Sequence, residues 1–230
     1  MPTAQAALVA INPSNGAISA LVGGFDFYQS NFNRATQAAR QPGSNFKPFI
    51  YTAALENGMT PATIINDAPI VFDDASLEDT WRPENASGKF FGPTRLRQAL
   101  YKSRNLVSIR VLRSTGIGNT LKGMERYHFN QSNMPRDLSL ALGSYELTPL
   151  QVATGYTVFA NGGYKVNPHL ITRIEDVDGE IVFETKPATV CKECEEPQDE
   201  NSEVFSNLDD AQLARAPIKK RRRKARFVSG

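Results

Sequence analysis

Two short apolar runs at the start of the chain predict a β-hairpin. They span residues 6–11 and 17–22, and the segment between them, Asn12 to Gly16, has the composition of a turn. Two glycines follow the second run and end it. We therefore expect two antiparallel strands here.

A helix is predicted from about Ser44 to Glu56, because apolar side chains recur there at three- and four-residue spacing. Pro48 fits the first turn of such a helix, where its missing N–H costs little. Asn57-Gly58 then supplies a C-terminal stop. The helix is expected to begin at or just before Ser44.

Two further helical patterns follow. The first runs from Pro93 to about Thr115 and is interrupted near residues 102–105, and the second runs from Thr148 to Asn161. Thr148 is placed to cap the second helix, and a proline takes the first helical position.

A second hairpin is predicted at residues 170–176 and 180–184, because Asp178-Gly179 between them is a strong turn signal. Residues 59–93 instead contain four prolines and isolated aromatic residues without a sustained period. We expect an irregular, well-packed connection there.

The composition is ordinary for one globular domain, since 40% of the 230 residues are apolar and 22% are charged. The formal net charge of +2 is uneven, because seven of the 26 basic residues lie between positions 219 and 226. Without these seven, 19 basic residues stand against 24 acidic ones. Charge therefore gives no reason to expect nucleic acid or an anionic membrane as a partner.

The composition changes after residue 190. We interpret residues 191–217 as an acidic flexible segment, since residues 193–210 hold eight acidic residues and few apolar ones. Residues 218–230 form a basic tail. We consider three interpretations of this tail, in order of preference. It is a segment that does not belong to the domain, a genuine solvated tail, or a segment for nucleic-acid binding or nuclear targeting.

The only cysteines, Cys191 and Cys194, form a C-x-x-C pair in the acidic segment rather than at a strand-to-helix turn. This position disfavours thioredoxin-type redox chemistry and favours a local disulfide or inert thiols. A zinc site would need further ligands, which His128 or His169 would have to supply from far away. We predict no metal and no cofactor.

The sequence has no run of 18 apolar residues and no signal-peptide pattern after Met1. Any membrane anchor or export signal is therefore expected to lie outside these residues, in a longer parent protein.

Ser44 and Lys47 form a candidate catalytic pair. Their three-residue spacing at the start of a helix puts the hydroxyl and the amine on one face. A partly buried lysine has a lowered pKa and can take the serine proton, while N–H groups at the helix start favour an oxyanion. With two histidines and no Gly-x-Ser-x-Gly, a Ser-His-Asp hydrolase has little support. The packing alternative is a capping serine and a lysine that lies along apolar surface.

Ser103-Arg104-Asn105 is the second candidate element, because it is the only Ser-x-Asn in the chain and lies where a helical pattern breaks. A serine there can relay a proton to a leaving amine, and an asparagine can donate to a substrate carbonyl or hold the lysine. The alternative is a polar junction between helices.

Four stretches, together with these two motifs, resemble the transpeptidase domain of class A, bifunctional penicillin-binding proteins. The stretches are Val9–Pro13, Leu21–Phe25, Gln41–Phe49 and Leu140–Ser144. The resemblance covers about residues 5–217 and implies the α+β fold of penicillin-binding proteins and serine β-lactamases, an antiparallel sheet flanked by helices. On this basis we assign residues 1–190 to a partial transpeptidase domain.

The resemblance implies that Ser44 is the acylated nucleophile, Lys47 its general base, and Ser103 and Asn105 the second motif. The family cross-links peptidoglycan: it attacks the D-Ala-D-Ala end of one stem peptide and passes the acyl group to an amine of a neighbouring strand. β-Lactams mimic that dipeptide and trap the serine. The implied location is the periplasmic side of the bacterial inner membrane, with the parent protein anchored in the membrane.

The third motif of the family, Lys-Thr-Gly or Lys-Ser-Gly, does not occur in the 230 residues. In the family it lies on a core strand that pairs with the substrate and supplies an oxyanion N–H. The family's preceding glycosyltransferase domain and membrane helix are also missing. We therefore expect impaired activity. We also expect poor solubility or partial folding, because the first hairpin would keep an unpaired edge and an uncovered apolar face.

Three other functions stay open. A β-lactamase or D,D-carboxypeptidase would hydrolyse the acyl-enzyme, and release of free D-Ala without cross-linked product would indicate it. A non-catalytic penicillin-binding or sensor module would keep the cleft without turnover. A nucleic-acid binder that uses the basic tail is the least favoured.

Overall fold

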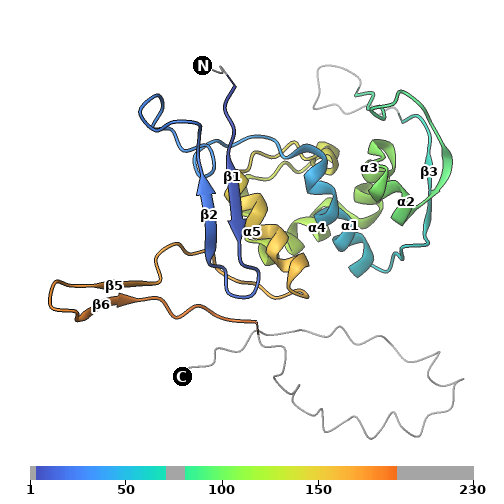
Figure 1. Cartoon of the computed structure of the whole chain (residues 1–230). Coiled ribbons are helices and arrows are strands. Elements are labelled where there is room, and N and C mark those ends of the chain that lie inside the picture. Colours follow the sequence, from blue (N-terminus) through green and yellow to red (C-terminus); the bar gives the residue numbers. More distant parts are fainter. Residues whose placement is uncertain (1–3, 71–80, 191–230) are drawn as a thin grey trace, which may run out of the picture.

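The computed structural model describes residues 4–70 and 81–190. The acidic segment predicted at 191–217, the basic tail predicted at 218–230 and the Cys191-Cys194 pair lie outside the described residues. Figure 1 shows a group of helices beside a two-stranded sheet, with a second hairpin that projects away from them. Helices combined with small antiparallel sheets agree with the expected α+β class.

The first hairpin consists of β1 (Leu8–Ile11) and β2 (Ile18–Val22), which pair antiparallel as predicted. One face of β1 contacts α5 (Pro149–Ala160), which lies beside it in Figure 1. Leu8 and Val22 lie opposite each other on the strands and are 53% and 50% exposed. Apolar surface thus remains accessible on this hairpin, and the expected partial folding stays a prediction.

The helix predicted at Ser44 starts as a tight 3-10 turn and continues as an α-helix. The turn, η1, spans Gly43–Phe46, and α1 spans Lys47–Glu56. Pro48 lies in the first turn of α1, where its missing N–H needs no partner. Ser44 therefore belongs to the 3-10 turn, and Lys47 opens the α-helix.

The long helical pattern is divided into α2 (Leu96–Tyr101) and α3 (Asn105–Thr115), which confirms the predicted interruption. The residues before α2 form β4 (Gly92–Arg95), which pairs antiparallel with β3 (Ile64–Asp67). The expectation of a wholly irregular connection at 59–93 is therefore wrong. β4 contains a glycine and a proline and has no apolar alternation, so its local pattern carries no strand signal.

The helix α5 begins with the predicted cap. The Thr148 hydroxyl accepts from the backbone N–H of Gln151, whose side chain accepts from the backbone N–H of Thr148. No helix in the described part of the chain is long and apolar enough to cross a membrane. The helical elements without a prediction from the sequence are α4 (Ile117–Met124), η2 (Glu125–Tyr127), η3 (Gln131–Asn133) and η4 (Leu138–Leu142).

The second hairpin consists of β5 (Arg173–Glu175) and β6 (Ile181–Glu184), which confirms its prediction. Gly179 lies in its turn with a φ of 84°. The hairpin extends away from the helices in Figure 1, and its apolar side chains are exposed, with Val177 fully and Val182 67% accessible.

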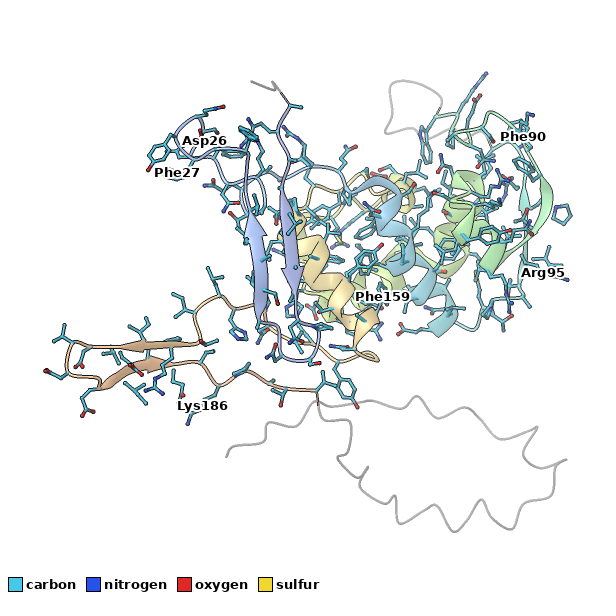
Figure 2. The ribbon with its side chains drawn as sticks, viewed as in Figure 1. Asp26, Phe27, Phe90, Arg95, Phe159 and Lys186 are labelled. Atoms are coloured by element: carbon cyan, nitrogen blue, oxygen red, sulfur yellow. The ribbon has the colours of Figure 1, made fainter. Side chains whose placement is uncertain are left out.

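The hydrophobic core is built around α1 and α3. The ring of Phe49 in α1 contacts those of Tyr127, Phe129, Tyr156 and Phe159, with centroid distances of 4.9, 4.8, 5.3 and 5.1 Å. Figure 2 labels Phe159, which reaches from α5 toward α1. This aromatic cluster ties α1 to α5 and so supports the turn that precedes α1.

Candidate active site

Lys47 joins the two predicted motifs. It opens α1, and only 1% of it is exposed to solvent. Its Nζ donates to the backbone oxygen of Ser103 at 2.8 Å, to Ser103 Oγ at 2.9 Å and to Asn105 Oδ1 at 2.7 Å. Both residues of the second motif therefore meet the lysine of the first motif at one amine.

Burial lowers the pKa of the Lys47 amine from 10.5 to about 8. Near pH 7.5, roughly a quarter of such an amine is neutral, against roughly 0.1% at the ordinary pKa. A neutral amine can keep its hydrogen bonds to the carbonyl oxygens of Ser103 and Asn105, while its lone pair accepts from a hydroxyl. The arrangement can therefore take a proton from a serine.

Ser44 lies one turn before Lys47 in η1 and is exposed. The backbone beside it contacts Gly143, because the Gly43 N–H donates to the Gly143 oxygen at 3.3 Å. Gly143 has a φ of 71°, and a Cβ there would lie 2.1 Å from the backbone oxygen of Gly43. Only glycine allows this approach, so position 143 determines where the turn with Ser44 lies.

Two further contacts hold the same turn. Tyr156 of α5 donates its hydroxyl to the backbone oxygen of Asn45 at 2.8 Å. Arg40 and Leu147 exchange backbone hydrogen bonds of 3.0 and 2.9 Å. The turn that contains Ser44 is thus supported by segments more than a hundred residues along the chain.

Ser103 and Asn105 lie where α2 gives way to α3. Ser103 is exposed and has a φ of 53°, in the left-handed region that residues other than glycine seldom adopt. The Arg104 N–H donates to the Ala99 oxygen at 2.8 Å, which closes this turn. The turn brings Ser103 Oγ within hydrogen-bonding distance of the Lys47 amine, while Ser103 as a whole stays exposed.

The segment that holds Asn105 could not be predicted from the sequence. Asn85 is 5% exposed, and its Oδ1 accepts from the Asn105 backbone N–H at 2.9 Å. Asn85 lies in the stretch that was expected to be irregular, twenty positions from the helix it caps. Local patterns carry no signal for a cap at that separation.

The two histidines have structural positions. His128 ends η2 in a left-handed conformation, and burial lowers its pKa. His169 exchanges backbone hydrogen bonds with the first hairpin. Within residues 4–70 and 81–190, neither histidine is hydrogen-bonded to Ser44 or Lys47.

The family model of the penicillin binding protein transpeptidase domain matches residues 6–220. The chain belongs to the penicillin-binding protein transpeptidase family. Penicillin-binding protein 1A of Pseudomonas aeruginosa is 55% identical over 190 residues, which are 83% of this chain and 23% of that protein. Penicillin-binding protein 1A of Escherichia coli is 48% identical over 218 residues, which are 93% of this chain and 26% of that protein.

Solved structures of penicillin-binding proteins share the fold. Penicillin-Binding Protein 1A from Haemophilus influenzae has a TM-score of 0.80 at 42% identity, covering 85% of this chain and 29% of that chain. PonA1 from Mycobacterium tuberculosis, in complex with penicillin V, has a TM-score of 0.68 at 25% identity, covering 79% and 51%. The expected penicillin-binding fold is confirmed, and this transpeptidase-family chain spans about a quarter of the length of its curated relatives.

Proposed function

We propose that the chain carries the acyl-transfer site of a peptidoglycan D,D-transpeptidase, with Ser44 as the nucleophile. The observation that supports the proposal is the buried Lys47 amine. It lies one turn beyond Ser44 and is hydrogen-bonded to Ser103 and Asn105 of the second motif. A serine without a histidine needs another base, and an amine with a pKa of about 8 is neutral often enough to serve. The substrate is a stem peptide that ends in D-Ala-D-Ala.

In the first step, the Ser44 hydroxyl gives its proton to the neutral Lys47 amine, and Oγ bonds to the carbonyl carbon of the penultimate D-Ala. The N–H groups at the start of the helix favour the oxyanion that forms. Collapse of this intermediate breaks the carbon–nitrogen bond, and the leaving D-Ala amine takes the proton. Ser103 Oγ, 2.9 Å from Nζ, relays that proton because a hydroxyl both accepts and donates.

In the second step, an amine of a neighbouring stem peptide attacks the ester carbon. It loses a proton to Lys47 through Ser103, and the bond to Ser44 Oγ breaks with return of the proton to the serine. Asn105 Oδ1, which accepts a hydrogen bond from Lys47 Nζ at 2.7 Å, holds the lysine amine in place in both steps. The product is a cross-linked peptide, and the reaction consumes no cofactor.

β-Lactams are the second ligand class of the proposal. A relative from Mycobacterium tuberculosis is described in complex with penicillin V. A lactam offers Ser44 an equivalent carbon–nitrogen bond, but its amine stays tethered after the ring opens. We place the reaction on the periplasmic side of the bacterial inner membrane, with the parent protein anchored in that membrane.

Covalent labelling by a fluorescent penicillin tests the proposed function. We expect intact mass to show one adduct on the wild-type chain and peptide mapping to place it at Ser44. Ser44→Ala removes the nucleophile and Lys47→Ala removes the base, so both changes should abolish the adduct.

Ser19→Ala and Lys122→Ala are matched controls, because both residues are exposed on elements outside the site. Both controls should be labelled like the wild type. Folded wild-type chain that acquires no adduct would contradict the proposal, as would an adduct that persists in Ser44→Ala.

A further inference from the structure

The start of α3 is capped from outside the helix. Arg104 at the N-cap position makes no side-chain capping hydrogen bond, although the first N–H groups of a helix lack partners within it. Asn85 fills this place, since its Oδ1 accepts from the N–H groups of Asn105 at 2.9 Å and Leu106 at 3.5 Å. Two separate segments are therefore tied together at the residue that opens α3.

Asn85 is itself held in one orientation. Its Nδ2 donates to Asp67 Oδ1 at 2.8 Å and to the backbone oxygen of Lys89 at 2.9 Å. The buried amide thus uses its acceptor and both of its donors. Aspartate at position 85 would lack both N–H donors, and alanine would lack the donors and the acceptor. Of these side chains, only an amide can make all of these hydrogen bonds.

Asp67 anchors the arrangement from the end of β3. It is 0% exposed, and its Oδ2 lies 3.8 Å from Nε of Arg104. The Arg104 guanidinium lies over the ring of Phe91, 3.4 Å from its centroid. A buried ion pair adds little to stability by itself. Its presence behind the second motif therefore indicates that the pair positions Arg104 and the motif residues beside it.

The same segment sets the direction of the Asn105 side chain. The backbone oxygen of Glu84 accepts from Asn105 Nδ2 at 2.8 Å, which leaves Oδ1 facing the Lys47 Nζ at 2.7 Å. A reversed amide would point its own donors at the amine. Glu84 and Asn85 therefore hold both the side chain and the backbone of Asn105.

We propose that Asn85, supported by Asp67, is a positioning residue for acyl transfer: it acts through Asn105 to hold the Lys47 amine in line with Ser44. The inference rests on the proposed function of Ser44 and Lys47 and adds a residue outside both motifs. The hydrogen bonds of Asn85 reach Asp67, Lys89 and the first two residues of α3 rather than Ser44 or Lys47, so its effect passes through the start of α3.

Asn85→Ala tests the proposal, with Asn161→Ala as the matched control. Asn161 also bridges two segments, through its amide and the backbone oxygens of Pro13 and Tyr164, but it lies at the end of α5. The measurement is the rate of Ser44 labelling by fluorescent penicillin from about pH 6 to about pH 9.

For Asn85→Ala we expect a fall of about tenfold or more, because small displacements of catalytic groups are costly. The pH midpoint should move upward, because a loosened second motif admits water to the Lys47 amine. Asn161→Ala should keep the wild-type midpoint. Equal rates and midpoints in the two variants would show that Asn85 only stabilises the fold and would overturn the proposal.

If Asn85→Ala does not fold, a variant in which the side chains of Asn85 and Asp67 are exchanged serves as the test. Asn85→Asp alone sets two carboxylates at a distance of 2.8 Å, whereas Asn85→Asp with Asp67→Asn restores a donor and an acceptor. Faster labelling in the exchange than in Asn85→Asp supports positioning. An exchange that labels no faster overturns it.

A wild-type chain that is never labelled would contradict the proposed function but leaves the positioning role testable. NMR titration of the Lys47 side chain, assigned with Lys47→Met, reports its pKa without any reaction. A pKa that rises in Asn85→Ala but not in Asn161→Ala supports the proposal, and equal titrations overturn it.

Discussion

Changing the pH should change the rate of Ser44 acylation through one group, the buried amine of Lys47. Its pKa of about 8 results from burial, and the amine accepts a proton only when it is neutral. The neutral fraction is roughly 1% at pH 6, roughly 50% at pH 8 and roughly 90% at pH 9. The rate should therefore rise about fiftyfold between pH 6 and pH 8 and less than about twofold between pH 8 and pH 9.

The assay is the labelling rate with fluorescent penicillin at fixed ionic strength across this range. Lys47→Arg should not be labelled at any of these pH values, because a guanidinium stays protonated. Lys102→Ala is the matched control, since Lys102 is exposed and precedes Ser103 in the same turn. It should keep the wild-type profile.

Two outcomes would refute this reasoning. A rate that still climbs about tenfold between pH 8 and pH 9 would mean that the amine keeps its ordinary pKa. A flat profile in the wild type would mean that Lys47 is not the base.

Two further predictions concern Gly143 and the cost of burying Lys47. Gly143→Ala should slow Ser44 labelling about tenfold or more, because the new Cβ would meet the Gly43 oxygen. Gly118→Ala is the control and should keep the wild-type rate, because its new Cβ would have no atom within 4 Å. Equal labelling rates in the two variants would show that the contact between Gly143 and Gly43 does not matter for the reaction. The folded-state pKa of Lys47 is lowered from 10.5 to about 8, so the unfolded chain binds more protons between these values. The free energy of unfolding of the wild type, measured in urea and compared with that of Lys47→Met, should rise by up to about 3 kcal/mol from pH 8 to pH 10.5. Free energies of unfolding that change with pH in the same way in both proteins would contradict this.

Signals that lie within a few residues were sufficient for much of the fold. The capping pattern at Thr148, the Asp178-Gly179 turn and the break before Asn105 each predicted an element that the structure contains. A partly buried lysine was expected at the start of the first helix, and Lys47, which opens α1, is 1% exposed.

Contacts between distant segments could not be predicted in this way. β3 and β4 pair across more than twenty residues, and Pro93 gives β4 no strand signal. The cap that Asn85 provides and the approach of Gly143 to Gly43 likewise depend on how the whole chain packs. The candidate residues were therefore accessible from the sequence, but their supports were not.

The contact between Gly143 and Gly43 also limits how this site can evolve. A side chain at position 143 would strike the main-chain oxygen of Gly43, an atom that every amino acid carries. No replacement at position 43 can make room for one at position 143, so the two positions cannot compensate for each other along a mutational path. On the proposed role of Ser44, we therefore expect inherited variation in its reaction with an inhibitor to arise on the other sides of the site.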